Sequence, residues 1–213
     1  MLLNGTWRFA YFDRDIDVPE TINEWSTIDV PSCWQLRGYD SPNYTNINYP
    51  YPCDPPYVPD DNPCGVYEKE FEVKELWGKV YFVLEGVSSC AFVEINSRYI
   101  GYTQGSHLQA EFDITPFVIQ GINVVRVKVL KWCCGSYLED QDSFRYNGIF
   151  RDCYILQRPE NHIVDITVSS ESNKYIIVNT GVSADISLFD ADGNLLEVKK
   201  DSERSVFFVE NPV

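Results

Sequence analysis

The chain has 213 residues, a net charge of -15, and 44% hydrophobic and 15% aromatic residues. This length suffices for one large domain and part of a second, and the aromatic content for a substantial core. The negative charge argues against nucleic acid and anionic membrane surfaces as partners, because both attract basic protein surfaces.

The seven cysteines are odd in number, irregularly spaced and contain no Cys-x-x-Cys pair. Neither His107 nor His162 has metal-ligand spacing from a cysteine, so we expect reduced thiols. The N-terminus lacks a basic segment followed by an apolar run, and no apolar stretch is long enough to cross a bilayer. We therefore expect a cytoplasmic protein without a signal peptide or membrane contact.

Period-two alternation of apolar and polar residues dominates the first part of the chain, which is typical of half-buried strands. In one such strand Tyr67, Phe71 and Val73 share a face opposite three glutamates, the first of which is Glu68. Short helical turns are expected only near Glu20–Trp25 and Thr115–Gln120. The predicted strands are Val66–Val73, Lys79–Leu84, Cys90–Ile95, Tyr99–Tyr102, Val124–Trp132 and Ile149–Leu156. Many short strands joined by turns predict an all-β sandwich or jelly roll.

Two segments depart from this pattern. Tyr49–Pro63 holds six of the twelve prolines and predicts a long extended loop, because proline cannot donate to a central strand. The connection after Trp132 contains Ser136–Asp142 (SYLEDQD) and is longer and richer in carboxylates than an ordinary turn between strands. We expect binding function there, since binding residues concentrate on such loops.

Beyond Pro159 the chain alternates again, with Asp190–Asn194 as a hairpin turn signal. The predicted strands are Ile163–Val168, Tyr175–Asn179, Ile186–Phe189, Leu195–Val198 and Val206–Val209. Fewer residues remain than the about 100 that an immunoglobulin-like sandwich needs. We therefore predict a jelly-roll domain over residues 1–159 and an incomplete immunoglobulin-like β-sandwich over residues 160–213, in a fragment of a longer protein.

Two longer sequence words stand out, Tyr44–Pro50 (YTNINYP) and Ser136–Asp142, the second followed closely by Gly148–Asp152 (GIFRD). Shorter words accompany them along the first domain: LNGTWRF at 3–9, VPSCWQ at 30–35, PPYVP at 55–59, GYTQ at 101–104 and EFDI at 111–114. Together they resemble the N-terminal region of the β-galactosidases of glycoside hydrolase family 2. The resemblance implies a galactose-binding-like jelly roll that supplies one wall of the pocket for terminal β-galactosides.

The same resemblance places a substrate-contacting asparagine at Asn46 and, at Asp142, an aspartate that bonds sugar hydroxyls and ligates sodium. Carboxylates accept strong hydrogen bonds, amides both donate and accept, and hard cations prefer oxygen ligands. Taken alone, Asn46 would be a turn residue, and Asp142 would be solvated or paired with Arg145 or Arg151. Glu139 is expected to hold the loop structurally.

Asp140 is expected to be structural as well, and Trp7, Trp34 and Trp132 to pack in the core rather than to stack on sugars. The clustered carboxylates lie too close in sequence to flank a glycosidic bond from both sides. In the family, the catalytic glutamates and the magnesium ligands belong to a TIM barrel that follows this region. We therefore expect no catalytic residue and no cofactor in this chain, and magnesium and sodium only in the full enzyme.

The implied partners are β-galactosides, the C-terminal catalytic domains of the same polypeptide, and other copies in a homo-oligomer. The chain departs from the family at Cys33, where asparagine is common, and at Cys133-Cys134, where a Ser-Asp pair is common. Two alternatives stay open: a free-standing, non-catalytic carbohydrate-binding module, which should end at a completed domain, and a purely structural interaction domain.

Overall fold

The computed structural model describes residues 1–46, 48–139 and 142–210, and it divides into two compact units that meet between Gln157 and Arg158. This division lies two residues before the boundary expected at Pro159. The helical elements of the described chain are the short 3-10 helices η1 (Asp15–Asp17), η2 (Trp34–Arg37) and η3 (Cys134–Leu138). None of the described helices has the length and apolar character needed to cross a bilayer.

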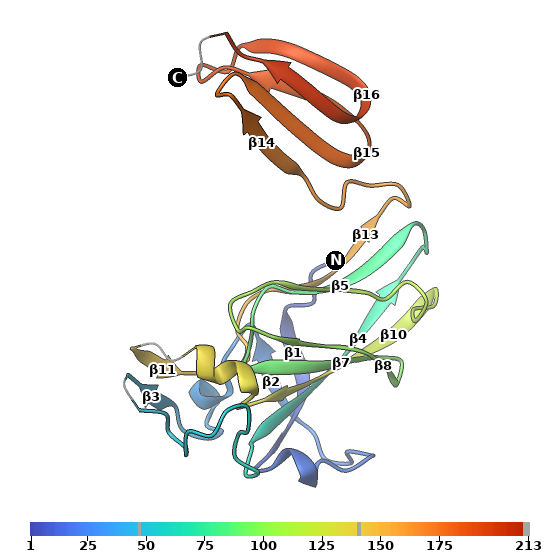
Figure 1. Cartoon of the computed structure of the whole chain (residues 1–213). Helices are drawn as coiled ribbons and strands as arrows, with labels where there is room; N and C mark the ends of the chain where they lie inside the picture. Colours follow the sequence, from blue (N-terminus) through green and yellow to red (C-terminus); the bar gives the residue numbers. More distant parts are fainter. Residues whose placement is uncertain (47, 140–141, 211–213) are drawn as a thin grey trace. The chain divides into compact units, whose positions relative to one another are not determined.

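The first unit is a jelly-roll sandwich built from two main antiparallel sheets and two short strand pairs (Figure 1). The six-stranded sheet has the order β2 (Ser26–Val30), β1 (Gly5–Phe12), β4 (Cys64–Val73), β10 (Gly121–Leu130), β7 (Cys90–Ile95) and β8 (Arg98–Gln104). The smaller sheet has the order β13 (Cys153–Arg158), β5 (Lys79–Leu84) and β9 (Ala110–Asp113). The short pairs are β12 (Gly148–Ile149) with β6 (Val87–Ser88), and β11 (Ser143–Arg145) with β3 (Asn43–Thr45).

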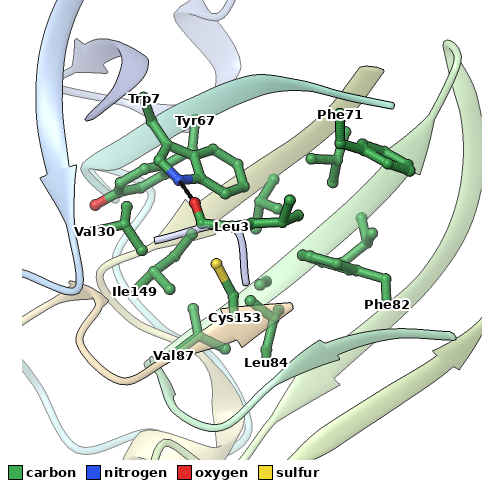
Figure 2. Close-up of a cluster of buried hydrophobic side chains, with 14 of the residues drawn as sticks. Leu3, Trp7, Val30, Tyr67, Phe71, Phe82, Leu84, Val87, Ile149 and Cys153 are labelled. Carbon is green, nitrogen blue, oxygen red and sulfur yellow. Dashed lines mark hydrogen bonds between the residues drawn. The ribbon is translucent and has the colours of Figure 1, made fainter. Parts of the chain in front are cut away.

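The core lies between the two main sheets. Figure 2 shows Tyr67 and Phe71 of the large sheet gathered in one cluster with Phe82 and Leu84 of the small sheet. Trp7 joins this cluster and donates its indole N–H to the carbonyl of Leu3 at 2.9 Å. Burial of each large apolar side chain stabilises the fold by roughly 1.5–3 kcal/mol.

All three tryptophans expected in the core are buried. Trp7, Trp34 and Trp132 are 1%, 0% and 6% exposed. A buried ring has no free face for a sugar, so none of them serves as a stacking platform in this chain.

Most predicted strands of the first unit are confirmed, including Lys79–Leu84 and the hairpin of β7 and β8. The exit strand predicted over Ile149–Leu156 is interrupted and forms β12 and β13 instead. The helical turn expected near Glu20–Trp25 is wrong, because that segment is irregular. The turn expected near Thr115–Gln120 is present, and the Val118 N–H there donates to the carbonyl of Ile114 at 3.2 Å.

The predicted solvent-facing position of Glu68 is also wrong. The side chain does lie on the face opposite Tyr67, but it is buried there between two arginines. Its carboxylate oxygens lie 2.5 Å from Arg8 Nη1 and 2.6 Å from Arg126 Nη2. The Arg8 guanidinium carbon lies 4.4 Å from the centre of the Trp25 ring, so this ring covers the arginine side of the ion pair.

The second unit is one three-stranded antiparallel sheet with the order β14 (Thr167–Glu171), β15 (Tyr175–Phe189) and β16 (Leu195–Phe208). The five strands predicted here are therefore wrong in number: four of them merge into the two long strands. The register of β15 shifts between Asn179 and Ala184, which marks a bulge where the strand bends. Such a bulge interrupts the alternation of apolar and polar residues, so the sequence pattern predicts two strands where there is one. The hairpin turn at Asp190–Asn194 is confirmed.

Candidate functional site

A two-stranded ladder brings the two predicted site residues together. β3 pairs with β11 in antiparallel register, with Ser143 opposite Thr45 and Phe144 opposite Tyr44. Asn46 follows β3 directly, and Asp142 directly precedes β11, so both lie at the same end of the ladder. Figure 1 shows β3 and β11 side by side at the lower left of the first unit.

One hydroxyl group links these two side chains. The Tyr44 hydroxyl donates a hydrogen bond to Asp142 Oδ1. That hydrogen bond is the main cause that raises the pKa of Tyr44, while a hydrogen bond with the Asn46 side chain lowers it. Asn46 and Asp142 therefore converge on the same oxygen atom, and both residues are exposed to solvent.

Aromatic packing supports the ladder from one side. The rings of Tyr44 and Phe144, which lie opposite each other in the register, pack edge to face at 5.5 Å. Phe144 also packs against Tyr146 at 6.1 Å. Cross-strand aromatic pairs contribute about 0.2–1 kcal/mol each to a ladder, which matters for one this short.

The Pro-rich segment after Asn46 is fixed to the end of β10 and to η3. The buried Asn62 side chain makes two hydrogen bonds of 2.9 Å with the backbone of Trp132, one to its carbonyl and one from its N–H. The Tyr137 hydroxyl of η3 donates to the carbonyl of Tyr57 at 2.6 Å. Tyr49 donates its hydroxyl to the carbonyl of Tyr137 at 2.6 Å. These contacts join the two loops that carry Asn46 and Asp142.

Glu139 has a structural role. Its carboxylate accepts hydrogen bonds from the backbone N–H of Ser106 at 2.6 Å and from the Ser106 hydroxyl at 2.8 Å. Arg145 Nη1 lies 3.4 Å from the same carboxylate. Arg151 donates to the carbonyl of His107 at 3.0 Å, so it does not serve as the ion-pair partner considered for Asp142. Asp140 lies outside the described residues.

A depression of about 310 Å³ lies beside β11. Phe144, Arg145, Glu139 and Ser106 are among its lining residues. Asn46 and Asp142 do not line it and instead lie at the exposed end of the ladder. This depression is therefore not a pocket that the two side chains share.

The carboxylate of Asp142 is the one predicted metal ligand in this chain. Among the residues that the structure describes, no cluster of three His, Cys, Asp or Glu side chains could hold a metal ion. An exposed carboxylate at a loop end fits a hard cation such as sodium as a single ligand, and the other oxygens would have to come from elsewhere.

The fold is a jelly-roll sandwich followed by a separate three-stranded sheet. The model of the glycosyl hydrolases family 2 sugar-binding domain matches residues 1–159, and the chain therefore belongs to this family. The match covers the whole first unit, including both site loops.

Curated relatives are β-galactosidases. The chain is 46% identical to that of Actinobacillus pleuropneumoniae over 173 residues, which is 80% of this chain and 17% of the relative. It is 44% identical to that of Yersinia pestis bv. Antiqua (strain Angola) over 195 residues, 87% of this chain and 19% of the relative. The chain thus spans less than a fifth of the length of these proteins.

Solved structures share the fold at lower identity. The β-glucuronidase of Faecalibacterium prausnitzii superposes with a TM-score of 0.70 and 16% identity, over 98% of this chain and 40% of the other. A β-glucuronidase from an uncultured Clostridium sp. superposes with a TM-score of 0.67 and 19% identity, over 98% of this chain and 39% of the other. The superposition covers both units of the chain.

Sequence reasoning missed Tyr44 and Asn62. Tyr44 lies two residues before Asn46, and alternation along a strand places positions i and i+2 on the same side, which could have indicated the shared hydroxyl. Asn62 gave no such signal, because its partner Trp132 lies at the end of a distant strand.

Proposed function

We propose that this chain is the N-terminal part of a β-galactosidase and forms one wall of the pocket that binds terminal β-galactosides. In this proposal Asn46 and Asp142 contact hydroxyl groups of the sugar, and Asp142 also ligates a sodium ion. The β-galactosidase relatives at 44% and 46% identity support the substrate class.

The observation that carries the proposal is the convergence of Asn46 and Asp142 on the Tyr44 hydroxyl at one end of the β3–β11 ladder. A carboxylate accepts two hydroxyl hydrogen bonds, and a neighbouring amide can donate to one sugar oxygen while accepting from another. Two such groups side by side can grip adjacent hydroxyls on one ring. An isolated polar residue could not fix the orientation of the ring.

In this proposal, hydrolysis is carried out by other domains of the full enzyme. Those domains contain the catalytic glutamates and the magnesium ligands. The chain by itself then has no hydrolytic activity. We also place the protein in the cytoplasm and in a homo-oligomer as the full enzyme. The seven free cysteines support the cytoplasmic assignment, because secreted proteins usually pair their thiols.

Deoxygenated substrates test the contact directly. The kcat/KM of the full-length enzyme and of its Asn46→Ala variant is measured on an aryl β-galactoside and on its monodeoxy analogues. Removal of the hydroxyl that Asn46 contacts should cost the wild type more than the variant, because the variant has already lost that hydrogen bond. Equal losses in both enzymes for every analogue would exclude a sugar contact by Asn46.

A further inference from the structure

Three cysteines line one depression of the first unit, away from the ladder of Asn46 and Asp142. Cys90 begins β7, and Cys133 and Cys134 lie at the start of η3. The depression has a volume of about 600 Å³, and Tyr102 is also part of its wall.

Cys90 and Cys133 belong to one cluster of packed buried side chains. The backbone segments that carry them are hydrogen-bonded side by side: Ser89 N donates to the carbonyl of Leu130 at 3.0 Å, and the Ser89 hydroxyl to that of Lys131 at 2.7 Å. The sulfur of Cys133 lies 3.7 Å from the carbonyl oxygen of Ser89. The register of β7 and β10 places Cys90 opposite Leu130, which lies three residues before Cys133.

Besides the Ser89 carbonyl, the sulfur of Cys133 has several hydrogen-bond donors around it. Cys133 precedes η3 in a reciprocal arrangement with Ser136, whose backbone N–H points at the sulfur and whose hydroxyl oxygen lies 3.9 Å from it. Cys90 is a further donor, and its hydrogen bond is the main cause that lowers the pKa of Cys133. The pKa of Cys90 is raised by the same contact and by burial. A lowered pKa favours the thiolate, which is the nucleophilic form.

We propose that Cys133 and Cys90 form a reactive dithiol that is modified by small-molecule disulfides, with Cys133 as the attacking thiolate and Cys90 as the resolving thiol. Both cysteines line the depression, and Cys133 is 6% exposed whereas Cys90 is only 1% exposed. This difference in exposure suits the two roles, because only the attacking sulfur must contact the small-molecule disulfide. Cys134 and Cys53 are exposed, and neither belongs to the cluster that contains Cys90.

The reaction consists of two exchanges. The Cys133 thiolate attacks one sulfur of a disulfide R–S–S–R, a mixed disulfide forms on Cys133, and one R–S⁻ leaves. Cys90 then releases its proton to water and attacks the Cys133 sulfur, and the second R–S⁻ leaves. The two cysteines are oxidised to one disulfide, and the small disulfide is reduced to two thiols.

Mass spectrometry of the 213-residue chain tests the proposal. The reduced chain is treated with glutathione disulfide, quenched with acid, alkylated and digested with trypsin. Cleavage after Lys79, Arg98, Lys131 and Arg145 separates Cys90 from the peptide that holds Cys133 and Cys134. We expect a cross-linked pair of peptides 80–98 and 132–145, with fragmentation that places the link at Cys133. Glutathione adducts confined to Cys53 or Cys134, with Cys90 and Cys133 alkylated, would overturn the proposal.

Two variants separate the roles. In Cys90→Ser, which retains a hydrogen-bond donor, Cys133 should stop at a stable glutathione adduct because no resolving thiol is present. In the control Cys134→Ser, the link between Cys90 and Cys133 should form as in the parent chain. Loss of the link in Cys134→Ser would assign the attack to Cys134 and contradict the proposal. The result on the parent chain stands alone if Cys90→Ser fails to fold.

Discussion

The Tyr44 hydroxyl donates a hydrogen bond to the carboxylate of Asp142, and this contact connects the loop after β3 to the loop before β11. The two segments are far apart in the sequence, so the contact exists only in the folded protein. Asn46 shares the same hydroxyl. A preorganised pair of polar groups loses less free energy on binding than two that must first be ordered.

Replacement of Tyr44 by phenylalanine tests whether this preorganisation matters. The hydroxyl is lost while the ring still packs against Phe144, so the ladder should remain. We expect KM of the full-length enzyme for an aryl β-galactoside to rise several-fold, with little change in the melting temperature. An unchanged KM would show that Asp142 and Asn46 hold their positions without the hydroxyl.

Gly148 should not tolerate a side chain. A Cβ atom there would lie 2.8 Å from the carbonyl oxygen of Ser32 and 2.8 Å from the Tyr67 hydroxyl, and φ is +127°. We expect Gly148→Ala to lower the free energy of unfolding by roughly 2–6 kcal/mol, the sum of backbone strain and overpacking. Denaturant unfolding of the chain measures this loss.

Gly5 is the matched control, with φ of +100° and no atom within 4 Å of an added Cβ. Its alanine variant should show the strain contribution alone, roughly 1–3 kcal/mol. Equal losses for Gly148→Ala and Gly5→Ala would mean that the contacts with Ser32 and Tyr67 relax without cost.

The two hydrogen bonds between the Asn62 side chain and the Trp132 backbone should stabilise the Pro-rich segment. Asn62→Ala leaves a buried N–H and a buried carbonyl of Trp132 without these partners, which should cost roughly 2–4 kcal/mol. Asn62→Asp keeps the acceptor but buries a carboxylate with one oxygen facing the Trp132 carbonyl, so we expect a loss at neutral pH at least as large as that of the alanine variant. Thermal unfolding of the three proteins gives the order, and an alanine variant as stable as the parent would contradict it.

The sequence predicts the first unit well because several of its strands follow the alternation closely, as in β10, where Val125, Val127 and Val129 all meet the core. It predicts the second unit less well, because the irregular pairing within β15 breaks the period without ending the strand. Glu68 was misplaced for a related reason: alternation gives the face of a side chain but not what covers that face. Arg8 and Arg126 come from neighbouring strands, which no local pattern reveals.

The candidate site was identified from two sequence words that resemble a family, and not from the chemistry of the residues. Neither Asn46 nor Asp142 differs locally from an ordinary loop residue. Their proximity follows from the register of β3 and β11, which three residue pairs define. A ladder this short lacks the alternating pattern that makes longer strands predictable.

The second unit should exchange its backbone hydrogens faster than the first. Its single sheet exposes large apolar side chains, among them Val168 at 64% and Phe189 at 55%, so fewer contacts oppose local opening. Hydrogen exchange of the dilute chain should show weaker protection over residues 167–208 than over β4 and β10. Equal protection in both units would contradict this expectation.

The central claim is that Asp142 contacts the sugar, and kinetics of the full-length Asp142→Ala enzyme test it most directly. Charged hydrogen bonds are worth about 1.5–3 kcal/mol each, so kcat/KM for an aryl β-galactoside should fall ten-fold or more. The melting temperature should not change, because the side chain is exposed. Asp192→Ala, in an exposed turn of the second unit, should leave kcat/KM unchanged. A full-length Asp142→Ala enzyme with the kcat/KM of the wild type would contradict the account.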